Sequence, residues 1–198
     1  MTQREGEAGH PATPPARLHA LAGYEDAEVR VRVAGNISTP AETLAELARD
    51  VDRMVRLMVA GNPQTPERVL ALLADDINLY VREMVGGNPN SPPEVLARLV
   101  KDPHWVVRRD VAWNPQTIPE LLVVLGRDKN DQVRRQADPP NRPLRRAYTI
   151  KPHFRYCLTH KDEAHPGRST GYPPAGVSTW KHLTGDVNVL FPPSKAFS

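Results

Sequence analysis

The sequence predicts an all-α solenoid of five helical repeats, followed by an irregular C-terminal tail. The first observation is a fixed period of 26 residues, marked by Asn36, Asn62, Asn88 and Asn114. A period between about 20 and 50 residues is typical of solenoid proteins. The second observation is that each repeat carries two short apolar stripes at helical spacing. Neither stripe could be buried within one repeat, so we expect stacked repeats to share a core.

The repeat is clearest at residues 62–87, which read NPQTPERVLALLADDINLYVREMVGG. Other copies begin at His10, Asn36, Asn88 and Asn114, so five repeats fill residues 10–138. The preceding residues 1–9 are short and polar, and we expect them to be disordered.

The first half of each repeat predicts a helix with a defined start. A threonine or serine precedes this segment in every repeat, where its hydroxyl could accept a backbone N–H as the N-cap. These residues are Thr13, Thr39, Thr65, Ser91 and Thr117. A proline follows in the first four repeats, at what would be the first helical position. The helix then buries two leucines three residues apart, such as Leu70 and Leu73, and ends near an aspartate.

The second half of each repeat predicts a second, shorter helical segment. It carries valines four residues apart, such as Val81 and Val85, and it ends before an Asn-Pro pair in most repeats. The residue before a proline is disfavoured in helical conformation, which explains the end of the segment. Because an end repeat has fewer neighbours, we expect Leu18→Ala to cost less stability than Leu70→Ala or Leu96→Ala.

Residues 139–198 form a tail that is rich in proline, aromatic and basic residues, and we expect it to be mostly irregular. The tail holds nine Lys and Arg against three Asp and Glu, a balance of +6. Residues 10–138 hold 16 against 18, a balance of −2. The basic character of the chain therefore belongs to the tail, which suggests either an anionic partner or docking on its own repeats.

The repeats resemble those of the leucine-rich repeat variant family, which is related to HEAT repeats. The shared pattern is N-P-x-[TS]-P-x-x-x-L-x-x-L-A-x-D followed by V-R-x-x-V-A-x-N, and it covers residues 10–138. The resemblance implies a right-handed superhelix in which α-helices alternate with 3₁₀ helices. It also implies that a cysteine-bound iron–sulfur cluster can precede the repeats. No cysteine precedes Cys157 in this sequence, so no cluster or other cofactor is expected.

One arginine recurs in all five repeats, and one asparagine recurs in four of them. The arginines are Arg30, Arg56, Arg82, Arg108 and Arg134, and an aspartate lies six residues before four of them. They could follow a phosphate backbone, but a structural Asp–Arg ladder that ties repeats together, as in HEAT repeats, is the preferred interpretation. On this view Arg30 has no aspartate because it has no preceding repeat. The asparagines could bind a peptide backbone, yet turn formation before proline explains them better.

Large side chains at variable positions of the second segments form the candidate partner-binding site. They are Met58, Tyr80, Met84, Trp105, Arg109 and Trp113, with Arg53 at the edge. Other repeats hold polar residues at the same positions, so the fold does not require apolar ones there. The competing interpretation is that the methionines fill gaps between repeats and the tail covers the tryptophans.

The tail offers two further candidates. Nucleic acid could bind its basic residues Arg142, Arg145, Arg146, Lys151 and Arg155, with bases stacked on Tyr148, Phe154 and Tyr156. A metal could bind His153, Cys157, His160 and His165, but their spacing matches no common zinc motif. Scattered histidines are the simpler explanation.

The expected function is binding without catalysis. The sequence has no G-x-S-x-G, glycine-rich phosphate loop or H-E-x-x-H motif. It has no apolar run near the roughly 18 residues of a membrane span, and no apolar signal core, so a cytoplasmic protein that does not enter membranes is expected. We therefore predict a repeat scaffold that binds another protein through the second-helix face and the tail, with nucleic-acid binding as the alternative.

Overall fold

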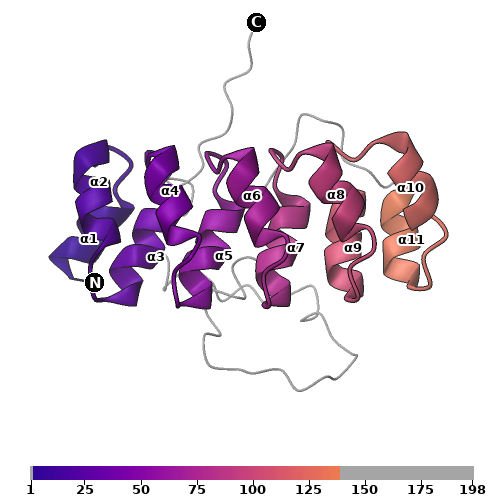
Figure 1. Ribbon diagram of the computed structural model, residues 1–198, viewed down its shortest axis with the longest axis horizontal. Helices are drawn as coiled ribbons and strands as arrows, with labels where there is room; N and C mark the ends of the chain where they lie inside the picture. The colour runs from indigo at the N-terminus through magenta and orange to yellow at the C-terminus, as the bar shows by residue number, and fades with distance from the viewer. Residues whose placement is uncertain (1, 139–198) are drawn as a thin grey trace, which may run out of the picture. The chain divides into compact units, whose positions relative to one another are not determined.

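The computed structural model describes residues 2–138, and these residues form eleven α-helices and no strand (Figure 1). The predicted all-α solenoid is therefore confirmed. The predictions for residues 139–198, including the irregular tail, lie outside the described residues.

The helices alternate between two layers. The first helix of each repeat is α2 (Pro15–Ala22), α4 (Ala41–Leu47), α6 (Glu67–Leu73), α8 (Pro93–Leu99) or α10 (Pro119–Leu125). The second is α3 (Ala27–Gly35), α5 (Arg53–Gly61), α7 (Leu79–Gly87), α9 (Trp105–Trp113) or α11 (Asp131–Ala137). Successive second helices contact each other, so the pairs follow one another in chain order through the array (Figure 1).

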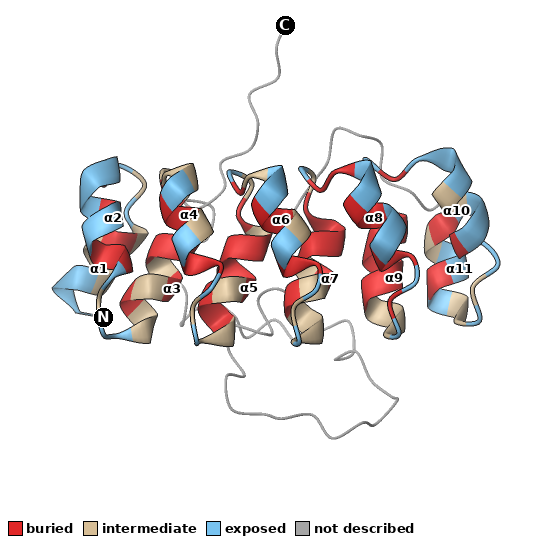
Figure 2. Ribbon diagram, in the orientation of Figure 1, coloured by how far each residue is buried: buried red, intermediate tan, exposed pale blue. Residues whose placement is uncertain are grey.

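The core lies between the two layers and is continuous from repeat to repeat (Figure 2). Leu18, Leu44, Leu70 and Leu96 of the first helices are fully buried. The valines of the second helices are equally inaccessible, as Val55, Val81 and Val107 show. A pair of helices of about eight residues each could not exclude water from these side chains alone, so the neighbouring repeats stabilise it.

The first helices begin one residue later than the hydroxyl pattern predicted. The N-cap is Pro40 in α4 and Pro66 in α6, with no side-chain cap, while the threonine lies one position before it. Thr39 Oγ1 donates to the Val33 carbonyl at 2.6 Å, near the end of the preceding helix. The hydroxyl therefore satisfies a helix C-terminus, where carbonyls lack partners, and the N-cap prediction for these residues is wrong.

The N-terminal segment is ordered, contrary to expectation. Residues Gln3–Gly9 form α1, in which Ala8 is fully buried. Arg4, Ala8 and Gly9 lie 26 residues before Arg30, Ala34 and Gly35, so α1 is a degenerate second helix. Its side chains are mostly polar, which hid the repeat pattern.

The second helices are longer than expected. Helices α3, α5, α7 and α9 each span nine residues, whereas α4, α6, α8 and α10 span seven. In residues 2–138 both members of each pair are α-helical, so the implied alternation with 3₁₀ helices is not observed. Bonds of 3₁₀ type occur just beyond the helix ends, for example from Asp50 N to Leu47 O at 3.1 Å.

Candidate functional site

A ladder of buried asparagines joins each repeat to the one before it. Asn62 donates both amide hydrogens backward, to the carbonyls of Ala34 at 2.8 Å and Asn36 at 3.0 Å. Its Oδ1 accepts the backbone N–H of Gln64 at 2.8 Å. The same three bonds recur at Asn36, Asn88 and Asn114.

These asparagines cannot serve as a peptide-binding row. Each is at most 2% exposed, and both amide hydrogens are already donated to backbone carbonyls. The turn interpretation is confirmed by the bond to the residue two positions on. The sequence did not reveal the longer bonds to carbonyls 26 and 28 residues earlier, which make the ladder a connection between repeats.

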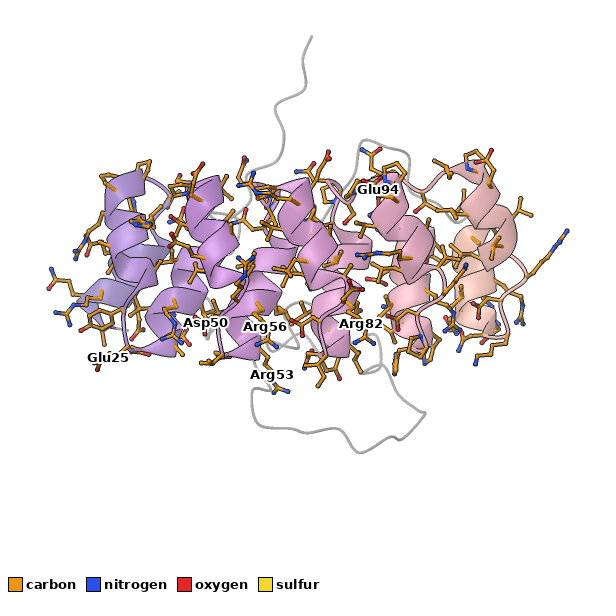
Figure 3. The ribbon with its side chains drawn as sticks, in the orientation of Figure 1. Glu25, Asp50, Arg53, Arg56, Arg82 and Glu94 are labelled. Carbon is orange, nitrogen blue, oxygen red and sulfur yellow. The ribbon has the colours of Figure 1, made fainter. Side chains whose placement is uncertain are left out.

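A second ladder pairs four of the five recurring arginines with the aspartate of the following repeat. Arg56 Nε lies 2.7 Å from Asp76 Oδ2, and its Nη2 lies 3.1 Å from Asp76 Oδ1. The third nitrogen, Nη1, donates to the carbonyls of Asp50 and Val51 at 2.9 and 3.2 Å. Figure 3 shows Asp50, Arg56 and Arg82 along one edge of the array. The equivalent pairs are Arg30–Asp50, Arg82–Asp102 and Arg108–Asp128.

The structural interpretation of the arginines is therefore correct, but the expected pairing was not. An arginine contacts the backbone carbonyl of the aspartate six residues before it, and the carboxylate 20 residues after it. Arg30 consequently has its carboxylate partner, Asp50, ahead of it. The bidentate geometry fixes the guanidinium planes, so these four arginines do not form a stripe that could follow phosphates.

The ion pairs also change the acidity of the carboxyls. The hydrogen bond from Arg108 is the main cause that lowers the pKa of Asp128, against the opposing effect of burial. Burial raises the pKa of Asp50, but the bonds from Arg30 and from Asp52 N–H outweigh it and leave the pKa lowered. Both carboxylates therefore stay ionised in their pairs.

The ladder begins with a different chemistry at the N-terminal end. Tyr24 occupies the aspartate position, and Arg4 of α1 occupies the arginine position. The Arg4 guanidinium lies 4.7 Å from the centroid of the Tyr24 ring and donates to its hydroxyl. A cation–π contact thus replaces the first ion pair.

Four of the candidate partner-binding residues lie on two adjacent second helices. Tyr80 and Met84 are one turn apart on α7, and Trp105 and Trp113 are two turns apart on α9. All four are partly exposed, and α7 contacts α9. We call these four residues the α7–α9 surface.

Two of the predicted site residues are buried. Met58 is 5% exposed, and its Cε methyl occupies the space that a side chain on Gly35 would need. Met58 therefore fills a gap between repeats, as the competing interpretation proposed. Arg109 is 7% exposed and supports the surface from within. Arg53, expected at the edge, is partly exposed on α5 (Figure 3).

Arg109 belongs to a charged cluster that the sequence pattern did not identify. Its Nη2 lies 3.1 Å from Glu83 Oε1, and its Nε lies 2.9 Å from Asp110 Oδ1. Glu83 and Asp110 are 3% and 1% exposed. The available signal was that charged residues stand at positions that hold the apolar Leu57 and Met58 in α5. Buried charges persist when they are paired, so the cluster fixes the Arg109 side chain.

Trp105 is held by its neighbours. The Arg109 guanidinium lies 5.5 Å from the centroid of the Trp105 ring, and the His104 ring stacks on it with centroids 6.4 Å apart. Since Arg109 is itself held by Glu83 and Asp110, it positions the indole of Trp105.

Other predicted sites fall outside this region. The nucleic-acid candidates Arg142, Arg145, Arg146, Lys151 and Arg155 and the metal candidates His153, Cys157, His160 and His165 lie outside the described residues. Within residues 2–138, no three His, Cys, Asp or Glu side chains are grouped as metal ligands. In the same range, each helix is too short or too polar to cross a bilayer.

Comparison with known proteins agrees with the repeat pattern. The family model described as leucine rich repeat variant matches residues 53–76 and 80–104. A solved structure, "A leucine-rich repeat variant with a novel repetitive protein structural motif", is 27% identical, with a TM-score of 0.35. The match covers 68% of this chain and 63% of that one, so this chain spans under two thirds of its length. No curated protein matches the chain.

Proposed function

We propose that this chain, whose repeats belong to the leucine-rich repeat variant family, is a non-catalytic scaffold that binds another protein through its second helices. The repeats supply a fixed framework, and side chains that the framework does not require select the partner. The α7–α9 surface is the best candidate for that role.

One observation carries this proposal: three aromatic side chains are partly exposed on the adjacent helices α7 and α9, whereas most apolar side chains of the array lie in the core. Tyr80, Trp105 and Trp113 stand where other repeats hold residues such as Glu28, Arg53 or Gly87. Tyrosine, tryptophan and arginine are enriched among residues that dominate binding energy at protein interfaces.

The contacts that His104 and Arg109 make with Trp105 favour the same function. A side chain that is already ordered loses less conformational entropy when a partner covers it. The contacts from His104 and Arg109 order the indole in this way. The fold itself does not need them, because the equivalent positions in α5 are Asp52 and Leu57.

The proposal can be tested with variants of the full chain. The double variant Trp105→Ala/Trp113→Ala removes two aromatic groups. Ile77→Ala is the control, because Ile77 is an apolar residue that is 92% exposed in the turn before α7 and is not one of the four residues of the α7–α9 surface. A protein cross-linked to the wild type in a cell extract would be identified, purified and titrated against each variant. We expect the double variant to bind at least about 30-fold more weakly, and Ile77→Ala to bind as the wild type does.

An unchanged Kd for the double variant, with a wild-type melting curve, would exclude this surface. The tail, which the sequence also suggested as a contact region, would be tested in the same titration by replacing Arg142, Arg145 and Arg146 with serine. A loss of binding there, and none at the tryptophans, would move the contact region to the tail.

A further inference from the structure

The C-terminal end of the described array exposes side chains at positions that interior repeats bury. Leu121 is partly exposed, although it stands where α6 and α8 hold Val69 and Val95, which are 3% and 1% exposed. Leu122, at the position of the fully buried Leu96, is also partly exposed. Figure 2 shows α10 mostly in the exposed and intermediate classes. In an interior repeat the following helix pair covers these positions, whereas α10 and α11 are the last described helices.

Arg134 of α11 is oriented like the ladder arginines of the interior, but its carboxylate-binding edge is open. Its Nη1 donates to the carbonyls of Asp128 and Lys129 at 2.7 and 3.0 Å, the same two bonds that fix each interior arginine. In the interior the Nε and Nη2 edge holds the aspartate 20 residues on. The residue 20 positions after Arg134 is Phe154, and no carboxylate within residues 2–138 pairs with this arginine. Arg134 is therefore an exposed guanidinium already oriented to bind a carboxylate.

A carboxylate lies on the same end face, one helical turn after Arg134. Asp138 is exposed and stands at the position that Gly86 occupies in α7. A side chain on Gly86 would meet Val107 and Val111 of α9 at 3.3 Å, so this position faces the following repeat. Residues 118–138 hold four Lys and Arg against four Asp and Glu, so the end of the array carries no net charge. The same face therefore carries a cation, an anion and an apolar helix.

The opposite end of the array does not offer a matching surface. Helix α1 packs on both helices of the first pair, and Leu18 and Val29 are as inaccessible as interior core residues. The side chains of α1 are mostly polar, and its Glu7 is paired with Arg17. A head-to-tail contact between two copies would set the apolar face of α10 against this polar helix. The contact that suits both faces is therefore a two-fold one between identical C-terminal ends.

We propose that the α10–α11 end, formed by Leu121, Leu122, Arg134 and Asp138, is a self-association surface that binds a second copy of this chain. A two-fold axis perpendicular to both helices places α10 against its copy and α11 against its copy, each pair antiparallel. The apolar faces of α10 then cover each other, and Arg134 of each copy binds Asp138 of the other. This surface does not include the α7–α9 surface, so the two proposals are independent.

Sedimentation equilibrium of the full-length chain, at about 1 to 200 µM protein, tests this surface by the dissociation constant of the dimer. Arg134→Asp and Asp138→Arg each place like charges opposite each other, so each should raise that Kd at least about tenfold. The combined variant Arg134→Asp/Asp138→Arg restores opposite charges and should return the Kd to within about threefold of the wild type. Arg68→Asp is the control, because Arg68 is exposed on α6 in an interior repeat, and it should leave the Kd unchanged.

The apolar half of the surface is tested by Leu121→Asp, which should leave the chain monomeric over the same concentrations. If circular dichroism shows that this variant is unfolded, the charge-reversal series decides the question by itself. Three results would overturn the proposal: a wild type that stays monomeric throughout, a dimer whose Kd is the same for Arg134→Asp and Arg68→Asp, and a combined variant that does not recover association. A monomer with α10 amides protected from hydrogen exchange would show that another part of the same chain covers this end.

Discussion

Asn88 shows how far the array depends on a single side chain at each junction. It donates to the carbonyls of Ala60 at 2.7 Å and Asn62 at 3.1 Å, and it accepts the N–H of Asn90 at 2.9 Å. All three hydrogen bonds are buried, since Asn88 is 2% exposed. Any replacement must leave backbone groups without partners in the interior.

The change Asn88→Ala should therefore cost about 2–4 kcal/mol of unfolding free energy, since it leaves buried donors and acceptors unpaired. Urea unfolding followed by circular dichroism would measure the loss. Gln64→Ala is the control, because Gln64 is exposed in a neighbouring turn. Similar midpoints for the two variants would show that the ladder contributes little.

His104 should make the stability of the array depend on pH. Its Nδ1 accepts the Val106 N–H as the N-cap of α9. Burial lowers the pKa of His104, helped by the charges of Arg82 and Arg108 and opposed by Asp102. A lowered folded-state pKa means that the neutral form is favoured on folding. The stabilisation of the fold by neutral His104 is therefore complete above the unfolded-state pKa near 6.5, and it is lost as pH falls below that pKa.

The variant His104→Asn tests this dependence, because Asn78 and Asn130 cap α7 and α11 in the same manner. We expect the wild type to lose more unfolding free energy than the variant between pH 7.5 and pH 5.5, by up to about 1 kcal/mol. Parallel losses in denaturant titrations at the two pH values would contradict this assignment.

At the scale of the helices, the arginine ladder holds successive repeats in register. Arg82 reaches from α7 to Asp102, whose side chain is only 4% exposed. The change Arg82→Met keeps most of the side-chain volume and leaves that carboxylate without its ion pair. Breaking a buried pair in this way costs about 3–5 kcal/mol.

The matched control is Arg98→Met on α8. The Arg98–Asp75 pair is 49% and 72% exposed, and pairs in solvent contribute less than about 1 kcal/mol. Thermal and urea unfolding of both variants would give the comparison. Equal losses would mean that burial of the ladder does not determine its strength.

The helices could be predicted well because the spacing of apolar residues that defines each helix lies within that helix's own sequence. Leu70 and Leu73 defined α6 without knowledge of any neighbour. The roles of the hydroxyls were less predictable, because Thr39 and Thr65 bond to carbonyls six residues earlier rather than to the helix that follows them. Helix α1 was missed since Gln3, Glu5 and Glu7 replace the valines of the repeat, although α1 packs against α3 as the other second helices pack against their neighbours.

The candidate site was predictable in part for the same reason. Positions that vary between repeats pointed to Tyr80, Met84, Trp105 and Trp113, which are partly exposed. The same criterion also selected Met58, which is buried over Gly35, because glycine at a neighbouring position opens a gap that the pattern does not display. The Glu83–Arg109–Asp110 cluster depends on side chains that meet across α7 and α9.

For the molecule as a whole, the contribution of a core leucine to the unfolding free energy should increase with the extent to which neighbouring helices bury it. Leu18 and Leu70 are both fully buried, so Leu18→Ala and Leu70→Ala should each cost about 2–5 kcal/mol. This revises the expectation that the first repeat is the weaker one, because Leu18 is as inaccessible as Leu70 and α1 packs on both helices of the first pair. Leu122→Ala should cost less, since Leu122 is partly exposed.

A urea series on the three variants would rank them. A loss for Leu18→Ala as small as that for Leu122→Ala would show that α1 does not protect the first pair. In that case the burial of Leu18 would not translate into stability.

The asparagine ladder also limits how such a chain can change its length. Every junction bond spans 26 or 28 residues, and the donors and acceptors on either side are the same at each step. Excision of residues 62–87 would join Gly61 to Asn88 and recreate an existing junction. Removal of one residue would instead shift the amide away from both carbonyls. Duplication or loss of sequence is therefore tolerated only in units of 26 residues, because only then does each asparagine amide meet both carbonyls.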